Sequence, residues 1–145
     1  MIFLDTNYLV SYYVDSEKHH ERSLEIADMI EDRNQVISRL VIGETINILD
    51  DKLKLDKKFI KEIYEELFSN YTVIEDHHFY DKALEDILNS KKRIPFFDHI
   101  YIVLMRDLKI TEIVSFDKHF NNQKGIKRVF WFENELKKYF NLKRN

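Results

Sequence analysis

The chain of 145 residues contains no cysteine, a single proline and only two glycines. The absence of cysteine excludes disulfide bonds, thiolate zinc sites and cysteine nucleophiles. With Gly43 and Gly125 as its only glycines, the sequence also lacks the P-loop and the dinucleotide-binding fingerprint, because each motif needs several glycines. If this protein handles phosphate groups, we expect it to do so with side chains and a metal ion.

Long apolar runs and an excess of positive charge are also missing. No apolar run approaches the roughly 20 residues that a membrane helix needs, and the N-terminus does not look like a signal peptide. We therefore expect no membrane partner and a cytoplasmic protein. The formal net charge is −3, whereas proteins that bind nucleic acid by bulk electrostatics are usually strongly basic. Local cationic patches or bound cations would have to hold a nucleic-acid partner.

The remaining composition is that of a globular protein, with 44% hydrophobic and 34% charged residues. The length fits one domain, and no linker, low-complexity tract or internal repeat interrupts it. We therefore expect a single domain over residues 1–145.

Apolar periodicity predicts strands and helices that alternate along the chain. The predicted strands are 2–5, 35–38, 72–75, 112–116 and 127–130. The predicted helices are 7–14, 19–30, 41–53, 57–69, 79–89, 97–108 and a last one that ends near Tyr139. Strands separated by helices are typical of βαβ units, so we expect an α/β fold with a mostly parallel sheet covered by helices.

Acidic residues fall where predicted strands end or helices begin. Asp5 closes the first strand and Asp117 closes EIVSF. Glu44 lies in the first turns of the helix after QVIS, and Asp98 starts the helix after Pro95. Because sites in open parallel sheets form outside the carboxyl ends of the strands, we expect all four acids on one rim. For Glu44 or Asp98 taken singly, a favourable interaction with the helix dipole is an equally simple explanation.

A cluster of carboxylates is unfavourable by itself, because like charges a few ångström apart raise one another's pKa and repel. A hard divalent cation resolves the repulsion, and Mg²⁺ or Mn²⁺ prefers carboxylate and water oxygens. We therefore predict that Asp5 helps to hold one or two such ions.

Three stretches of this sequence resemble the PIN domain, a compact nuclease fold that includes the ribonuclease toxins of the VapC type: MIFLDTNYLV, SRLVIGETINIL and FFDHIYIVLMRDLKITEIVSFDKHF. The last stretch is the most specific, since one Asp opens a helix and a second follows 19 residues later in an S/T-x-D-x-x-F setting. The resemblance covers essentially the whole chain and implies a three-layer α/β/α sandwich with a mostly parallel central sheet.

The resemblance also implies a site. The catalytic acids would be Asp5, Glu44, Asp98 and Asp117. Those that hold the Mg²⁺ or Mn²⁺ ions would be Asp5, Asp98 and Asp117. The hydroxyl and amide groups expected to support the acids belong to Thr6, Asn7 and Ser115, with Phe120 packed beneath the last acid.

The chain departs from the family pattern at His99, at His119 and in the turn Leu108–Ile110, where the family often has glycine. The two histidines are interpreted as substrate contacts or as packing residues. None of these departures removes an acid, so they bear on the shape of the substrate cleft.

The function expected from this resemblance is Mg²⁺- or Mn²⁺-dependent endoribonuclease activity, in which a metal-activated water hydrolyses the phosphodiester bond. Glu44 would ligate a second ion or orient the attacking water. RNA is the expected substrate through the resemblance alone. The compact size favours the toxin of a type II toxin–antitoxin system, with a small antitoxin and a second copy of the chain as partners.

Other functions remain as alternatives. A housekeeping PIN-domain nuclease that processes RNA and a catalytically inactive PIN-like scaffold both fit the same fold. A phosphatase of the haloacid dehalogenase type is disfavoured, because Asn7 stands where that class needs a second acid.

Cations shortly before Asp98 form the best candidate RNA contact: Lys91, Lys92 and Arg93. They would bind RNA phosphates. The alternative is a solvated helix C-terminus, where the helix dipole favours cations. A second, weaker candidate patch consists of Lys124, Lys127 and Arg128.

Overall fold

The computed structural model describes residues 1–130, and the predicted helix that ends near Tyr139 lies outside them. Within this range, one sheet of five strands has the order β3-β2-β1-β4-β5, and every neighbouring pair is parallel. The strands are β1 (Ile2–Leu4), β2 (Gln35–Ser38), β3 (Thr72–Ile74), β4 (Glu112–Val114) and β5 (Lys127–Val129). The prediction of a mostly parallel sheet is confirmed.

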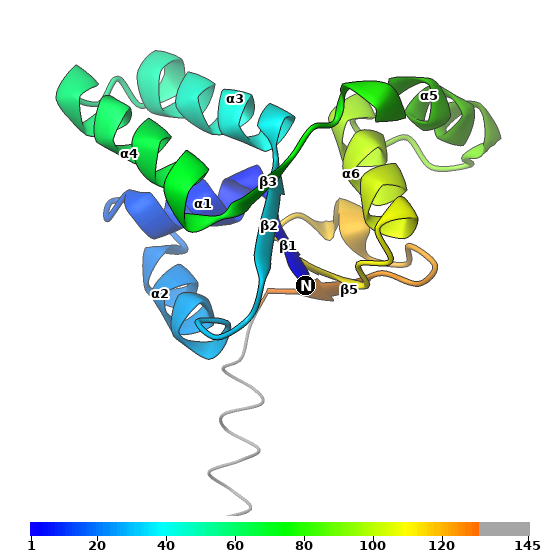
Figure 1. Cartoon of the computed structure of the whole chain (residues 1–145), viewed down its shortest axis with the longest axis horizontal. Helices are drawn as coiled ribbons and strands as arrows, with labels where there is room; N and C mark the ends of the chain where they lie inside the picture. Colours follow the sequence, from blue (N-terminus) through cyan, green and yellow to red (C-terminus); the bar gives the residue numbers. More distant parts are fainter. Residues whose placement is uncertain (131–145) are drawn as a thin grey trace, which may run out of the picture.

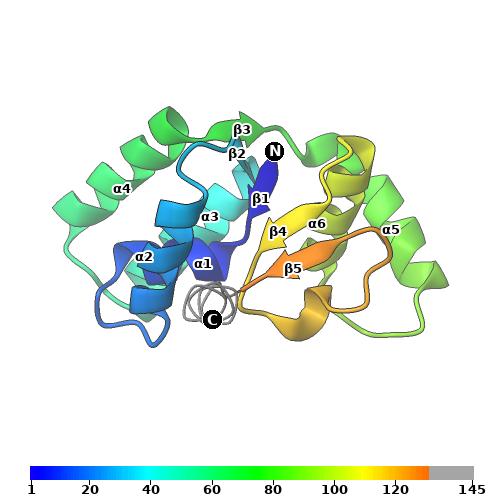
Figure 2. The same cartoon turned by 90° about the horizontal axis from the view of Figure 1, so that it is seen from below.

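Six α-helices cover this sheet in the described part of the chain: α1 (Thr6–Tyr13), α2 (His20–Met29), α3 (Arg39–Asn47), α4 (Lys57–Asn70), α5 (Tyr80–Asn89) and α6 (Phe96–Asp107). Helices α1 to α4 lie on one face, whereas α5 and α6 lie on the other (Figures 1 and 2). The arrangement is the expected three-layer α/β/α sandwich.

The central strand β1 is completely buried, with no exposed area on Ile2, Phe3 or Leu4. A strand that helices cover on both faces needs an unbroken apolar run instead of an alternating one, which explains this part of the sequence. Asp5 follows directly, so the first polar side chain after the core emerges at the carboxyl edge of the sheet.

The connections place a crevice beside β1. From β1 the chain moves outward to β2 and β3, and then returns on the other face of the sheet to β4, the second neighbour of β1. The direction of winding therefore changes between β1 and β4. In open α/β sheets such a switch point leaves a crevice at the carboxyl ends of the two strands, where ligands bind.

Two local features differ from a regular pattern. The predicted helix 41–53 begins earlier, at Arg39, because the Ser38 side chain caps it, and it continues after Asn47 as a π-helix over Ile48–Lys52. In the turn after α6, Lys109 adopts a left-handed conformation with φ of 58°.

No helix in residues 1–130 combines the length and the apolar character needed to cross a bilayer.

Candidate active site

Asp5 joins β1 to α1 and is held from two sides. Its Oδ1 accepts a hydrogen bond from the backbone N–H of Thr6 (2.8 Å), and its Oδ2 accepts one from Ser115 Oγ (2.7 Å). The pKa of Asp5 is raised to about 7, mainly by burial and in addition by the charges of Asp98 and Glu44, against the lowering effect of the two hydrogen bonds. A carboxyl group is therefore kept here at a substantial electrostatic cost.

Ser115 connects the ends of β1 and β4. Besides donating to Asp5, its Oγ accepts the backbone N–H of Asp117 (3.0 Å) and the side-chain amide of Asn7 (3.3 Å). The Asn7 carbonyl oxygen in turn accepts the backbone N–H of Phe116 (3.1 Å). Asn7 and Ser115 thus lie behind the acids and fix the loop after β4 against the start of α1.

Asp98 and Asp117 meet around the His119 ring. Asp98 lies in the first turn of α6, and Asp117 caps the short 3₁₀ helix Lys118–Phe120 by accepting the backbone N–H of His119 (2.9 Å). The Nδ1 atom of His119 lies 2.9 Å from Asp98 Oδ2 and 2.9 Å from Asp117 Oδ2. One potential ligand atom from each of the three residues falls within 4.8 Å of the others.

Asp98 shows the same electrostatic cost as Asp5. Burial raises its pKa to about 6. The contact with His119 opposes this increase, whereas the charges of Asp117 and Glu44 add to it. The repulsion expected for a carboxylate cluster is therefore present across three separate elements of the fold.

Glu44, on α3, completes the group from the opposite layer. The hydroxyl of Tyr101, one turn after Asp98 on α6, donates a hydrogen bond to Glu44 Oε1. Burial raises the pKa of Glu44, and the hydrogen bond from Tyr101 lowers it. Since the charge of Glu44 raises the pKa of both Asp5 and Asp98, it acts within the same cluster.

Thr6 provides a test of whether a cation fits here. Its side-chain oxygen is buried and makes no hydrogen bond of ordinary geometry, although it lowers the pKa of Glu44. Buried polar atoms are rarely left without a partner. A buried oxygen without an ordinary hydrogen bond, together with an excess of carboxylates, forms a set of oxygen donors that suits a hard divalent ion such as Mg²⁺ or Mn²⁺.

The structure thus brings all four predicted acids to one edge, but two partners were missed from the sequence. His119 was interpreted as a substrate contact or packing residue, whereas its ring lies between two carboxylates. Tyr101 was placed only on the apolar face of its helix. Its position three residues after Asp98 was the available signal, because residues at that spacing share a helix face.

The cationic segment before α6 lines two hollows. Lys92 and Arg93 line a hollow of about 450 Å³ together with Lys118 and His119. They also line a neighbouring one of about 600 Å³ that reaches His99, to which Lys91 contributes as well. Of the second candidate patch, Arg128 lies closest to the acids, because its guanidinium donates to the carbonyl of Ser115 (3.1 Å).

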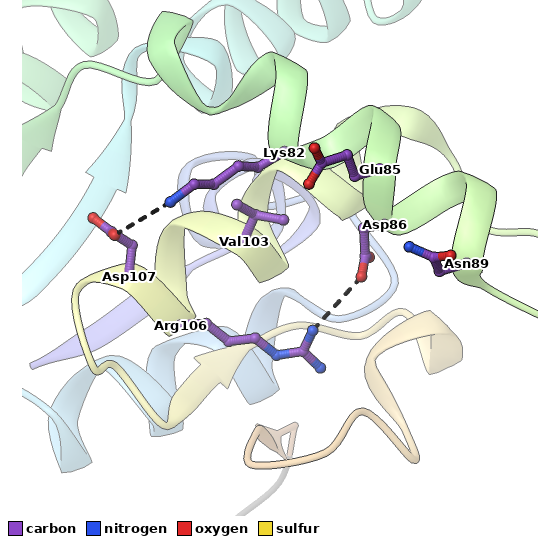
Figure 3. Close-up of a pocket in the computed structure, with 7 residues that line it drawn as sticks. All are labelled: Lys82, Glu85, Asp86, Asn89, Val103, Arg106 and Asp107. Atoms are coloured by element: carbon purple, nitrogen blue, oxygen red, sulfur yellow. Dashed lines mark ion pairs between the residues drawn. The ribbon is translucent and has the colours of Figure 1, made fainter.

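A further hollow lies between α5 and α6 (Figure 3). Two ion pairs join charged side chains on its walls: Lys82 with Asp107 (3.9 Å) and Arg106 with Asp86 (3.7 Å). Asp86 also contacts Nδ1 of the buried His99 at 2.6 Å. We interpret this region, the α5–α6 seam, as a network that holds two helices together.

A model of the PIN domain family matches residues 2–126. The chain therefore belongs to the PIN domain family, whose members are generally nucleases. This confirms the resemblance inferred from the sequence. Among curated proteins, none is a significant match.

Solved structures share the fold at low sequence identity. VapC20 of Mycobacterium tuberculosis, a sarcin–ricin loop cleaving toxin, has a TM-score of 0.70 and 17% identity, over 81% of this chain and 91% of its own. FitAcB from Neisseria gonorrhoeae has a TM-score of 0.60 and 17% identity, over 81% and 88%. PAE2754 from Pyrobaculum aerophilum has a TM-score of 0.63 and 19% identity, over 97% and 95%.

Proposed function

We propose that this protein is a Mg²⁺- or Mn²⁺-dependent endoribonuclease and the toxin of a type II toxin–antitoxin system. The observation that carries the proposal is the convergence of Asp5, Glu44, Asp98 and Asp117 at the carboxyl ends of β1 and β4, with raised pKa values at the first three. Membership of the PIN domain family supports a nuclease reaction at this edge.

In this proposal, Asp5, Asp98 and Asp117 hold one or two divalent ions. A bound ion supplies a water of lowered pKa and stabilises the charge that develops on the phosphate. Ser115 fixes the orientation of Asp5 through its 2.7 Å hydrogen bond. Glu44, oriented by Tyr101, either ligates a second ion or orients the attacking water.

RNA is the proposed substrate, and the segment before α6 is its proposed contact. The overall charge of −3 disfavours binding by bulk electrostatics. Lys92 and Arg93, however, share a hollow with His119, so cations lie beside the acidic cluster where a phosphate backbone would pass. Lys91 extends this cationic path into the next hollow. Neutralising all three should weaken RNA binding and flatten its salt dependence.

A toxin role is supported by the fold shared with VapC20. We include a small antitoxin and a second copy of this chain among its partners. An exposed apolar stripe on α5 favours the dimer, because Tyr80, Leu84 and Leu88 follow one another at a spacing of four with 37%, 52% and 75% of their area exposed. The double variant Leu84→Glu with Leu88→Glu should have half the mass of the parent chain in light scattering.

The test of the nuclease reaction is cleavage of mixed RNA by the full chain with Mn²⁺ or with EDTA. We expect cleavage only with Mn²⁺, and no cleavage by Asp98→Asn. In EDTA this variant should melt at the same temperature as the parent or higher, since it removes repulsion. Asp107→Asn is the matched control, because Asp107 lies on the same helix, half-exposed and paired with Lys82.

Two outcomes would contradict the proposal. One is undiminished cleavage by Asp98→Asn, and the other is cleavage by the parent chain that EDTA does not affect. An inactive scaffold, the main alternative, predicts no cleavage with either addition, together with RNA binding that does not depend on Mn²⁺.

A further inference from the structure

We propose that His119 is itself a metal ligand, which binds through Nδ1 beside Asp98 and Asp117 and shifts the preference of the site from Mg²⁺ towards Mn²⁺ and Co²⁺. This inference rests on the proposed metal-dependent nuclease function. It adds a nitrogen donor to a site that the sequence assigned to carboxylates alone.

The positions of the ligand atoms carry the proposal. His119 Nδ1 lies 2.9 Å from one oxygen of Asp98 and 2.9 Å from one oxygen of Asp117. In octahedral coordination with metal–ligand distances of about 2.1 Å, adjacent ligand atoms lie about 3.0 Å apart. The imidazole nitrogen therefore lies at the spacing of a neighbouring position from each carboxylate oxygen, and all three atoms lie within 4.8 Å of one another, so coordination needs little rearrangement.

The imidazole is also held in place. The backbone N–H of His119 donates to Asp117 Oδ1 (2.9 Å), and the next residue, Phe120, is completely buried. These contacts hold the short 3₁₀ helix in place on both sides of the His119 ring. At the same time 40% of the side chain is exposed, which leaves the position open to an ion from solution. A ligand that is fixed in advance and open to solvent suits metal binding.

The chemical consequence is a change of selectivity. Carboxylates and water suit Mg²⁺, whereas imidazole favours transition metals. Two carboxylates and one imidazole therefore form a mixed set that still accepts Mn²⁺ and binds Co²⁺ more tightly than a purely carboxylate set would.

The alternative role for His119 is that of a counter-ion, in which the protonated ring only neutralises the two acids. The two roles predict opposite effects when the ring is removed. If His119 is a ligand, its loss weakens Co²⁺ binding and leaves Mg²⁺ binding nearly unchanged. If His119 is a counter-ion, its loss strengthens the binding of every divalent ion.

The experiment is isothermal titration of the full chain with Mg²⁺, Mn²⁺ and Co²⁺ in turn. We expect His119→Ala to weaken Co²⁺ binding by about 10- to 100-fold, the range typical of groups that support a metal site. Mn²⁺ binding should weaken less, and Mg²⁺ binding by less than about threefold, since oxygen donors dominate for that ion. His119→Asp should keep Mg²⁺ binding and restore Mn²⁺ binding without restoring the preference for Co²⁺.

The controls separate this inference from the proposed function. His77→Ala removes an exposed histidine that is not among the clustered ligands and should change nothing. An unchanged ratio of Co²⁺ to Mg²⁺ affinity in His119→Ala, or an equal gain for all ions, would overturn the ligand role while leaving the carboxylate site intact. Failure of the parent chain to bind any of the ions would overturn both. Melting curves in EDTA verify that each variant folds.

Discussion

Two clusters of histidine and aspartate flank helix α6, and they differ in how their charges are matched. In the α5–α6 seam, Asp86 faces His99 at 2.6 Å and Arg106 at 3.7 Å, so one carboxylate meets two basic groups. In the candidate active site, His119 faces two carboxylates. Glu44 adds further negative charge to the second cluster, where it raises the pKa of both Asp5 and Asp98, and Asp98 also raises the pKa of Asp5.

Residue types alone therefore do not identify a site. Both clusters contain a His Nδ1 in contact with an Asp oxygen, yet one is electrically satisfied and the other has an excess of carboxylates. A satisfied pair stabilises packing, whereas an excess of buried like charge persists only where something else binds it. Four predictions test this comparison.

The largest expected effect is on the pH dependence of stability in EDTA. The pKa of Asp5 is about 7 in the folded chain, against 3.8 for an unperturbed aspartate carboxyl group. The unfolded chain therefore loses its proton first, and folding stability falls as pH rises between about 4 and 7. At about 1.4 kcal/mol per pKa unit, the loss from Asp5 is about 4 kcal/mol. Urea unfolding across this range should show a shallower fall for Asp5→Asn, and equal slopes would contradict the assignment.

The two histidines should differ in the stability they provide. His99→Ala removes a buried ring from its partner Asp86 and should cost about 2–3 kcal/mol of unfolding free energy. His119→Ala removes a ring that is 40% exposed and should cost less than about 1 kcal/mol, since solvent screens its contacts with the two carboxylates. Chemical denaturation at neutral pH in EDTA compares them. A larger cost at position 119 would reverse the distinction drawn between the clusters.

Tyr101→Phe tests the support of Glu44. Removing the hydroxyl deletes the hydrogen bond that lowers the pKa of Glu44, so stability should fall by about 1 kcal/mol at neutral pH. The loss should shrink as pH falls and Glu44 becomes protonated. Tyr64→Phe, at an exposed tyrosine on α4, should change stability by less than about 0.5 kcal/mol. Equal effects at the two positions would show that the hydroxyl of Tyr101 has no special role.

The smallest expected effect concerns the turn that joins α6 to β4, the two elements that position Asp98 and Asp117. Lys109 holds φ at 58°, a conformation that disfavours any residue with a Cβ. Lys109→Gly should raise the unfolding free energy by up to about 1 kcal/mol, because the relief of strain exceeds the entropic cost of glycine. Thermal melts would reveal the gain, and a lowered melting temperature would contradict it.

The main features of the site could be predicted from the sequence, because they depend on the topology of the sheet. Alternating strands and helices predicted the parallel sheet, and the positions of Asp5 and Asp117 after apolar runs predicted where that sheet would expose them. The resemblance to the PIN domain, and not the topology, placed Ser115 and Asn7 beside the acids, where the structure has them linked by a 3.3 Å hydrogen bond.

Other features depend on contacts that no local pattern carries. His119 follows Asp117 by two residues in a segment without periodicity, so the direction of its ring depends on α6, a distant element. The π-helix over Ile48–Lys52 was also hidden, since an apolar stripe with steps of three and four fits a regular helix equally well. The position of Lys92 and Arg93 on the walls of two hollows follows from the path of the loop, which composition does not determine.

The hydroxyl of Ser115 links residues 110 positions apart when it donates to Asp5. A growing polypeptide that has reached only residue 110 already contains Asp5, Glu44 and Asp98, yet it lacks the strand and the serine that draw them into register. Assembly of the acidic site is thereby postponed until nearly the entire described fold has emerged from the ribosome.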